Sequence, residues 1–422
     1  MIKGKQSIAF EVSPYLEESA SVVGKKEGEG PLGGMFDMVA EEDLFGENTW
    51  EEAESTMQKE ACLLALGKAH LAPESIRYLF GGDLLRQGVA TSMGVETLQI
   101  PMFGLYGACS TSGEALALAS MSVAAGYGER MLAVTSSHFG SAEKEFRFPL
   151  GYANQRPLSA HWTVTGSGAF IVGKNRSHVR ITGVTVGKIV DYGLKDSQNM
   201  GACMAPAACD TILQNLMDFG RGEKDYDWII TGDLGYVGQS ILFDLLRKKG
   251  LDIKENHMDC GMTIFDQQTQ HTNSGGSGCG CAAKGRSPCA VWRRIWPRPK
   301  AALWKNRRKQ HGKCERSEPA GPAEVERKHG PGGRKSVAQL PVPDAGTAAV
   351  CTDQSGRGKP VGGAAHPVEF VVKERRRAWR PKRKRKSWQR LRRRAAMTPA
   401  AWKTDSRWKR PWQGPVTAPA RA

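Results

Sequence analysis

The sequence predicts an α/β fold built from a duplicated α/β unit, with an incomplete second copy and a disordered basic tail. The tripeptide Gly-Asp-Leu occurs at 82–84 and again at 232–234, each time after a predicted helix, turn and apolar strand. Matching elements before a shared tripeptide favour duplication over chance. We therefore expect a first half at residues 1–200, a truncated second half at 201–283 and a tail at 284–422.

The charge distribution separates the tail from the rest of the chain. Residues 284–422 hold 37 Lys and Arg against 9 Asp and Glu, whereas the first 283 residues carry a net charge of −11. The tail also holds 8 of the 11 Trp and 15 of the 22 Pro, but one Ile, one Phe and no Tyr. Such a segment cannot bury enough apolar surface to offset its conformational entropy, so we expect low order from about residue 284.

Three interpretations of the tail compete. Trp interleaved with Arg and Lys over 375–394 favours an arm that binds nucleic acid or a membrane surface. A solvated linker is the second interpretation. We favour the third, translation in a shifted reading frame, because excess Arg, Ala, Gly, Pro and Trp is what off-frame GC-rich codons encode. We therefore expect no specific nucleic-acid partner, and an aggregation-prone product.

The elements of the two halves are predicted in order along the chain. A capping box at Thr49–Glu52 begins a helix that ends near His70, and 1–47 is polar and glycine-rich with a loop at 24–34. Further helices are expected at 112–126 and from 205 to 219, with Pro206 in the first turn. The glycine-rich stretch 274–281 should open a helix, but the tail begins instead. Strands are expected at 76–80, 101–105 (buried), 130–134, 169–172 (antiparallel to its neighbour), 179–190, 226–230 and 262–265.

Cys109 lies at a predicted strand-to-helix junction. Backbone N–H groups and the positive end of the helix dipole meet there, which favours a thiolate and can also hold a carboxylate or an oxyanion. A small cysteine buried in a packed turn is an equally favoured interpretation.

Three further positions directly follow predicted strands: His138, Asp191 and the glycines at 275–278. Ligands of open α/β sheets bind beyond the carboxyl ends of strands, so these positions and Cys109 are candidates for one pocket. Each also has a structural explanation. His138 is then a hydrogen-bonded core histidine, Asp191 stabilises a turn, and Gly275, Gly276 and Gly278 permit close packing.

The sequence predicts no membrane span, signal peptide or metal site. The N-terminus lacks a basic-then-apolar pattern, and no apolar run is long enough to cross a bilayer. The seven Cys before residue 284 are scattered, which suits a reducing cytosol. Cys279 and Cys281 have no second pair at zinc-site spacing.

Many short motifs in order carry a family resemblance over residues 1–283. A duplicated α/β unit with a cysteine at a strand–helix junction resembles the thiolase-like superfamily. More closely, the chain resembles the stage V sporulation protein AD family of spore-forming bacteria, through GPLGGMFD, GDLL, GACSTS, TSSH, RFP, TVTGSGA, MGACMAPAA, DYDWIITGDLG, MDCG and GGSGCGC.

The resemblance implies a thiolase fold that binds dipicolinic acid, alone or with calcium as its counter-ion, for uptake into the developing spore. It also implies membrane proteins of the same sporulation stage as partners, a cytoplasmic location or one peripheral to the spore inner membrane, and, by analogy, a homodimer. Cys109 falls on the thiolase nucleophile position, Asp191 on a family pocket position, and His138 in the matching TSSH segment. Gly275 and Gly276 complete the expected ligand site, without any other cofactor.

Two departures from the family's relatives bear on function. Condensing enzymes need a second-half His, or His and Asn, to activate the thioester. His271 and Asn273 lie in the matching loop, but the thiolase Gly-His-Pro is absent, which favours binding over turnover. The alternative is an acyltransferase in which Cys109 forms a thioester and His138 or His271 acts as the base. The second departure is that nothing recognisable follows Ala283, so the second half should have an exposed strand edge.

Overall fold

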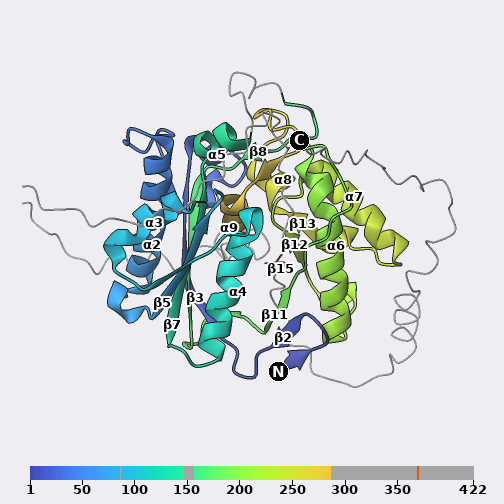
Figure 1. Ribbon diagram of the computed structural model, residues 1–422, viewed down its shortest axis with the longest axis horizontal. Coiled ribbons are helices and arrows are strands. Elements are labelled where there is room, and N and C mark those ends of the chain that lie inside the picture. The colour runs from blue at the N-terminus through green and yellow to red at the C-terminus, as the bar shows by residue number, and fades with distance from the viewer. Residues whose placement is uncertain (86, 147–155, 287–367, 370–422) are drawn as a thin grey trace, which may run out of the picture. The chain divides into compact units, whose positions relative to one another are not determined.

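The computed structural model describes residues 1–85, 87–146, 156–286 and 368–369, which form mixed α/β layers (Figure 1). The predicted α/β class is confirmed. The largest sheet has the strand order β10-β3-β9-β7-β5-β6, with β4 paired to β3. Its strands are β3 (Tyr15–Val23), β4 (Met38–Val39), β5 (Tyr78–Asp83), β6 (Met102–Gly104), β7 (Arg130–Ser137), β9 (Gly166–Gly173) and β10 (Val179–Arg180).

Helices cover both faces of this sheet. Alternate residues of a strand point to opposite faces. Leu132 of β7 packs with α2 (Trp50–Ala69), whereas Met131 packs with α4 (Thr111–Ala124). Figure 1 shows α2 and α3 (Val89–Val95) on one side of the strands and α4 on the other. β9 is antiparallel to both β3 and β7, as predicted.

The predicted start of α2 is confirmed in detail. The Thr49 side chain accepts a hydrogen bond from the Glu52 N–H at 3.2 Å, and the Glu52 carboxylate accepts one from the Thr49 N–H at 3.1 Å. The helix ends where His70 adopts the left-handed conformation. These are local interactions within a few residues, so the sequence alone specifies them.

The second half repeats the elements of the first. α6 (Met200–Phe219), a short 3-10 turn and β12 (Ile229–Thr231) follow one another, as α2, a 3-10 turn and β5 do. β12 pairs in parallel with β13 (His257–Asp259), as β5 pairs in parallel with β6. α7 (Gly235–Lys248) packs against α6. The predicted duplication is confirmed.

Two small sheets and four short helices complete the described part of the chain. One sheet has the order β1-β2-β11-β15, and in the other β8 pairs in parallel with β14 and so joins the two halves. The strands are β1 (Ile2–Lys3), β2 (Ser7–Ala9), β8 (Trp162–Thr163), β11 (Gly183–Val186), β14 (Gly276–Ser277) and β15 (Val368–Glu369). The helices are α1 (Lys25–Gly28), α5 (Phe139–Phe146), α8 (Cys260–Ile264) and α9 (Cys279–Arg286).

Several local predictions are wrong. Residues 262–265 were expected as a strand but belong mostly to α8, and the strand lies just before it, at β13. Pro206 is not in the first turn of its helix, because α6 begins at Met200 after an Asn199 cap. Of the strand predicted at 101–105, residues 102–104 form β6, but these three residues are exposed rather than buried, since β6 is the last strand of the sheet path.

The glycine-rich stretch does open a helix, contrary to expectation. α9 begins at Cys279 and is described to Arg286. β3, within the glycine-rich first 47 residues, was not predicted at all. The predicted disorder of the tail falls on residues outside the described ones, apart from 284–286 in α9 and 368–369 in β15.

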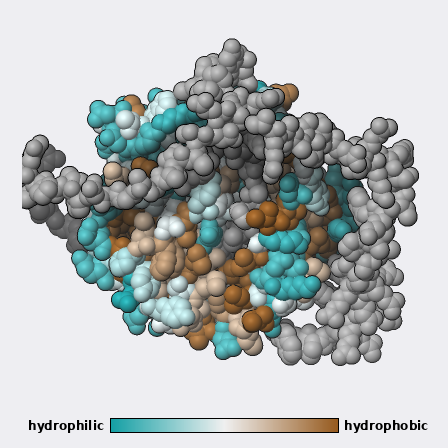
Figure 2. Space-filling view, in the orientation of Figure 1, coloured by the Kyte–Doolittle hydropathy of each residue, from teal (hydrophilic) through white to brown (hydrophobic). Residues whose placement is uncertain are grey.

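The described surface is mixed in polarity. Figure 2 shows hydrophobic residues in brown among hydrophilic residues in teal on one face. Among the described residues, no helix is both long enough and apolar enough to span a bilayer. The large hydrophobic residues that are more than half exposed are Met1, Ile2, Val12, Met93, Phe103, Tyr127, Leu158, Ile189 and Tyr192.

Candidate ligand site around Cys109

A tight turn places Cys109 ahead of α4. The Thr111 hydroxyl accepts a hydrogen bond from the Gly107 N–H at 3.0 Å and donates one to the Ala108 carbonyl at 2.8 Å. The Ser110 hydroxyl donates to the Gly107 carbonyl at 2.7 Å, so this side chain stabilises the turn instead of capping the helix. Ala108 has a φ of 48°, a left-handed conformation that is strained for a residue with a Cβ. The strain is held in place by these hydroxyl contacts.

Cys109 lies where the two halves meet. It is half-buried and packs against Leu84 and Cys279, and also against the core of the second half. Its thiol is hydrogen-bonded to the Asp233 carboxylate and to the Gly278 N–H. The Gly278 N–H also lies 3.2 Å from Asp233 Oδ2. One side chain of the first half is thus held by two groups of the second.

The surroundings keep the Cys109 thiol protonated. Burial, followed by the charge and the hydrogen bond of Asp233, raises the pKa of Cys109 well above its usual value, and the Gly278 amide opposes this only weakly. We expected the helix N-terminus to favour a thiolate. That expectation is wrong, because desolvation and a neighbouring carboxylate outweigh the helix dipole.

Cys279 is a second protonated thiol at the site. It is fully buried at the start of α9, and its Sγ donates to the Ser136 carbonyl at 2.7 Å. Burial, then the charges of Glu54, Asp83 and Asp233, raise the pKa of Cys279 well above its usual value. Neither thiol is prepared for nucleophilic attack at neutral pH.

A buried polar network lies behind Cys279. The Glu54 carboxyl accepts hydrogen bonds from the Ser136 and Ser141 hydroxyls at 2.8 and 2.7 Å. Burial, then the charge of Asp83, raise the pKa of Glu54 to about 7. Asp83 accepts hydrogen bonds from the Thr91 N–H and hydroxyl, at 3.0 and 2.8 Å. Acidic groups therefore surround the site on its inner side.

His138 is engaged with backbone groups. Its Nδ1 accepts a hydrogen bond from the Gly140 N–H at 3.0 Å, so Nε2 carries the proton and donates to the Asp43 carbonyl at 2.7 Å. The ring is 1% exposed. These contacts match the core-histidine interpretation, since both ring nitrogens have backbone partners.

Asp191 lies in the exposed loop between β11 and α6. Its Oδ1 accepts a hydrogen bond from the Gly193 N–H at 2.7 Å. This contact stabilises the turn, as the structural explanation of Asp191 predicts. Burial and the charge of Asp191 raise the pKa of Cys203 at the start of α6. Among the described residues, the interactions found for Asp191 are with Gly193 and Cys203.

The glycines of the second half make a close contact with the first. Gly275 and Gly278 have φ angles of 111° and 101°, which favour glycine. A Cβ on Gly276 would lie 2.8 Å from a methyl of Ile264 and 2.9 Å from one of Val164. The close packing brings the Gly278 amide to Cys109.

His271 and Asn273 precede these glycines. His271 is exposed, and the Asn273 side chain donates to the Pro157 carbonyl at 3.1 Å. Both have a positive φ, so the loop turns sharply before Gly275.

Asp233 is the site residue that the sequence analysis missed. It follows β12 in the second Gly-Asp-Leu triplet, and its counterpart Asp83 is the last residue of β5 within the first. In the sequence the triplet indicates duplication. The position of an acidic residue at the carboxyl end of a strand was the available signal.

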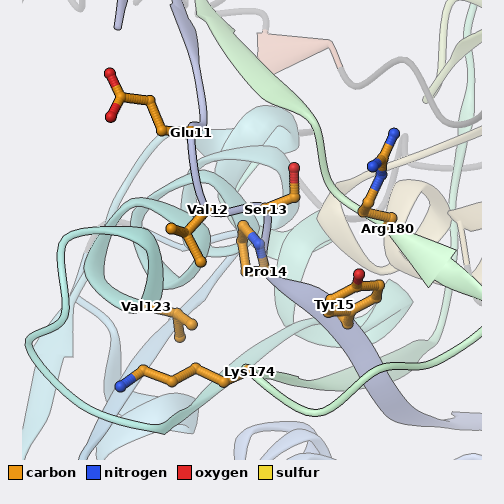
Figure 3. A pocket seen from close by; sticks show the side chains of 8 residues that line it. All are labelled: Glu11, Val12, Ser13, Pro14, Tyr15, Val123, Lys174 and Arg180. Carbon is orange, nitrogen blue, oxygen red and sulfur yellow. The ribbon is translucent and has the colours of Figure 1, made fainter.

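A separate cavity of about 270 Å³ contains none of the predicted site residues. It lies beside the first residue of β3 and the end of α4 (Figure 3). Among the described residues, no group of three or more His, Cys, Asp or Glu side chains could hold a metal ion. The lining residues are Glu11, Val12, Ser13, Pro14, Tyr15, Val123, Lys174 and Arg180.

Comparison with solved structures finds similar chains at low identity. An OleA variant of Xanthomonas campestris bound with cerulenin is 14% identical, with a TM-score of 0.47, over 68% of this chain and 90% of that one. The 3-oxoacyl-(acyl-carrier-protein) synthase III of Aquifex aeolicus is 14% identical, with a TM-score of 0.42, over 67% and 90%.

Sequence comparison gives a closer match. The family model of stage V sporulation protein AD matches residues 4–288. The stage V sporulation protein AD of Bacillus subtilis (strain 168) is 42% identical over 282 residues, which cover 67% of this chain and 83% of that protein. The chain therefore belongs to the stage V sporulation protein AD family.

Proposed function

We propose that the chain binds dipicolinic acid (pyridine-2,6-dicarboxylate) for uptake into the developing spore, and that its thiolase-like fold serves binding rather than turnover. Membership of a sporulation family supports the biological role. One observation carries the choice of binding: the Cys109 thiol is hydrogen-bonded to Asp233 and kept protonated. A nucleophilic cysteine needs a neighbouring base or cation instead.

Helix N-termini and calcium are the proposed partners of the ligand's carboxylates. α4 and α9 both begin beside Cys109, and free N–H groups at helix N-termini attract anions. The nearby Asp233 and the deeper Asp83 disfavour a bare dianion. The calcium chelate, in which the metal is the counter-ion of the ligand and no resident cofactor, suits acidic surroundings better.

Isothermal titration calorimetry of the full chain with dipicolinate tests the proposal. We expect binding that strengthens when calcium is present. Cys109→Ser should weaken it, because the proposed ligand lies against this side chain. No heat of binding with or without calcium would rule the proposal out.

Asp191, His138, Gly275 and Gly276 remain proposed ligand positions. For Asp191 the chain offers a matched control: Asp196 in the same loop accepts a hydrogen bond from the Gln198 N–H at 3.0 Å, as Asp191 does from Gly193. If Asp191 contacts ligand, Asp191→Asn should weaken binding and Asp196→Asn should not. Equal effects of the two substitutions on binding would show that Asp191 only stabilises its turn.

The acyltransferase alternative predicts an acyl adduct on Cys109 after incubation with an acyl-CoA. The binding proposal predicts an unmodified Cys109, because its thiol is protonated. Mass spectrometry of the intact chain and of its peptides measures this. A stable acyl adduct on Cys109 would favour the enzyme.

We further propose that the chain acts at the spore inner membrane with membrane proteins of the same sporulation stage, as a homodimer. The exposed strand β6 supports a second copy, since Met102 and Phe103 are 38% and 51% exposed. Edge strands with apolar side chains pair readily with another chain. Sedimentation of the wild type against Phe103→Lys measures the oligomeric state, and a monomeric wild type would contradict the proposal.

A further inference from the structure

β11 has a partner from the distant part of the chain. On one side it pairs with β2, and on the other it pairs antiparallel with β15. The register sets Val186 opposite Val368 and Thr185 opposite Glu369. β15 lies beyond residues 4–288, which the family model matches. A short piece of the tail is thus part of a sheet.

The first half contains the counterpart of this pairing. β3 precedes α2 in the first half, as β11 precedes α6 in the second. β3 pairs antiparallel with β9, as β11 pairs antiparallel with β15. β9 lies against α2 and α4, and β15 lies against α6 and α4. β15 therefore matches β9 in its antiparallel pairing and in its contact with the helix that corresponds to α2, and it shares α4 with β9.

The amino-acid sequence that begins at β15 resembles that of β9, and the structure describes Val368 and Glu369 of it. β9 contains Ala169-Phe170-Ile171-Val172, and the tail reads Glu369-Phe370-Val371-Val372. Phe370 is the one Phe of residues 284–422, in a region otherwise poor in strand-forming residues. In β9 Ala169 pairs with Ala20 of β3, and in β15 Glu369, at the matching position, pairs with Thr185 of β11.

An empty edge at β11 would be costly. With β15 in place, Val184 and Thr185 are each 1% exposed, so β11 is fully covered at these two residues. The Thr185 hydroxyl already bonds Ser7 at 2.8 Å and the Asn215 amide at 2.7 Å, which fixes the strand in place. Buried backbone N–H and C=O groups need partners, and a strand supplies them in a row.

We propose that β11 is a strand-acceptor edge of the second half, and that its occupant is this chain's own segment Val368–Glu369, in the place that β9 has in the first half. This assigns a structural role to one segment of the tail. It is independent of dipicolinate binding, because neither strand contains a proposed ligand residue.

A designed disulfide tests the pairing in the full chain. Opposed residues of antiparallel strands have Cα atoms about 4.5–5.5 Å apart, within the range that a disulfide spans. Val186→Cys with Val368→Cys should form a cross-link within one chain under mild oxidation, located by mass spectrometry of peptides. The matched control is Val186→Cys with Val342→Cys, another Val of the tail. We expect at least about fivefold more 186–368 product; equal yields, or products only between two chains, would overturn the proposal.

Hydrogen exchange gives a second test. Val368→Pro with Glu369→Pro removes two N–H groups from β15 and should speed exchange in 183–186 at least about tenfold. Peptides from β7 and β9 report whether the first half stays folded. Ala348→Pro with Ala349→Pro is the control and should change nothing. Unchanged exchange in 183–186 with the paired prolines of β15 would overturn the proposal.

Discussion

The two halves are built from the same elements but differ in what surrounds their strands. In the first half β5, β7 and β9 lie inside one sheet, with helices on both faces. Among the described residues of the second half, β12 pairs with β13 alone, and β11 belongs to a different sheet. The site lies between them, because Cys109 comes from one half and Asp233 and Gly278 from the other. The site therefore depends on the less extensively paired half.

The largest expected effect comes from truncating one fully buried leucine side chain in each half. Leu132 in β7 and Leu242 in α7 are both fully buried, so either Leu→Ala should cost about 3 kcal/mol. We expect Leu242→Ala to speed hydrogen exchange roughly 100-fold in β12 and β13 while β7 stays protected. Leu63→Ala, at a 40% exposed position of α2, is the control. Equal loosening of both halves by Leu242→Ala would mean that they unfold as one unit.

The next comparison uses pH. The pKa of Glu54 in the folded first half is about 7, above its ordinary 4.5, so the folded state holds this proton more tightly. The contribution of Glu54 to the free energy of unfolding is complete below about pH 4.5. It is lost as the pH rises through about 7, a change of about 3 kcal/mol. Urea unfolding of the first half followed against pH should show this loss, and Glu54→Gln should remove it. An unchanged pH profile in the variant would contradict the assignment.

The second half should respond in the opposite direction. Burial lowers the pKa of His257 from 6.5 to about 4. Its contribution is complete above about pH 6.5 and is lost as the pH falls towards 4, again about 3 kcal/mol. His257→Gln should abolish the acid sensitivity of β12 and β13, measured by urea unfolding between these pH values. If acid destabilises the variant as much as the wild type, other groups are responsible.

A smaller effect compares the two aspartates of the repeated triplets. Asp233→Asn removes the negative charge beside Cys109, so the pKa of Cys109 should fall and iodoacetamide should alkylate it about tenfold faster. Asp83→Asn is the matched variant of the first half. It should leave the alkylation rate of Cys109 unchanged, because the charge of Asp83 acts on Cys279 instead. Equal alkylation rates of Cys109 in the wild type and both variants would show that Asp233 does not raise the pKa of Cys109.

The smallest effect concerns the caps of the two equivalent helices. The Thr49 hydroxyl caps α2, and the Asn199 side chain caps α6 by accepting from the Ala202 N–H at 3.2 Å. Thr49→Ala and Asn199→Ala should each cost about 1 kcal/mol. Urea unfolding monitored by circular dichroism measures both. A loss at one helix only would show that the caps are not equivalent.

Local patterns allowed the prediction of α2 and of the repeated helix–turn–strand unit, because caps and turns act over a few residues. β3 escaped prediction because its polar residues are buried by distant partners. Ser21, for example, is fully buried and bonds Asp37. The sequence predicts a strand where α8 lies, because a short apolar run does not distinguish a strand from a helix.

The site was predictable in part. The turn at Cys109 follows from local sequence, but the protonated state of its thiol depends on Asp233, which lies far along the chain. No local pattern reveals such a pair. The glycines are predicted from strand ends, and Asp191 from a strand end and the family resemblance. The position of a strand end does not say which strand ends lie together.

The glycine contact between the halves also constrains how this chain can change over evolutionary time. A methyl group added at Gly280 would lie 2.5 Å from the Gly166 carbonyl and 2.6 Å from the Ser137 hydroxyl. A bulkier residue at this contact in one half therefore requires a smaller or shifted residue in the other half. Substitutions along this contact should appear in pairs, one in each half, so related sequences should preserve it as a coupled set.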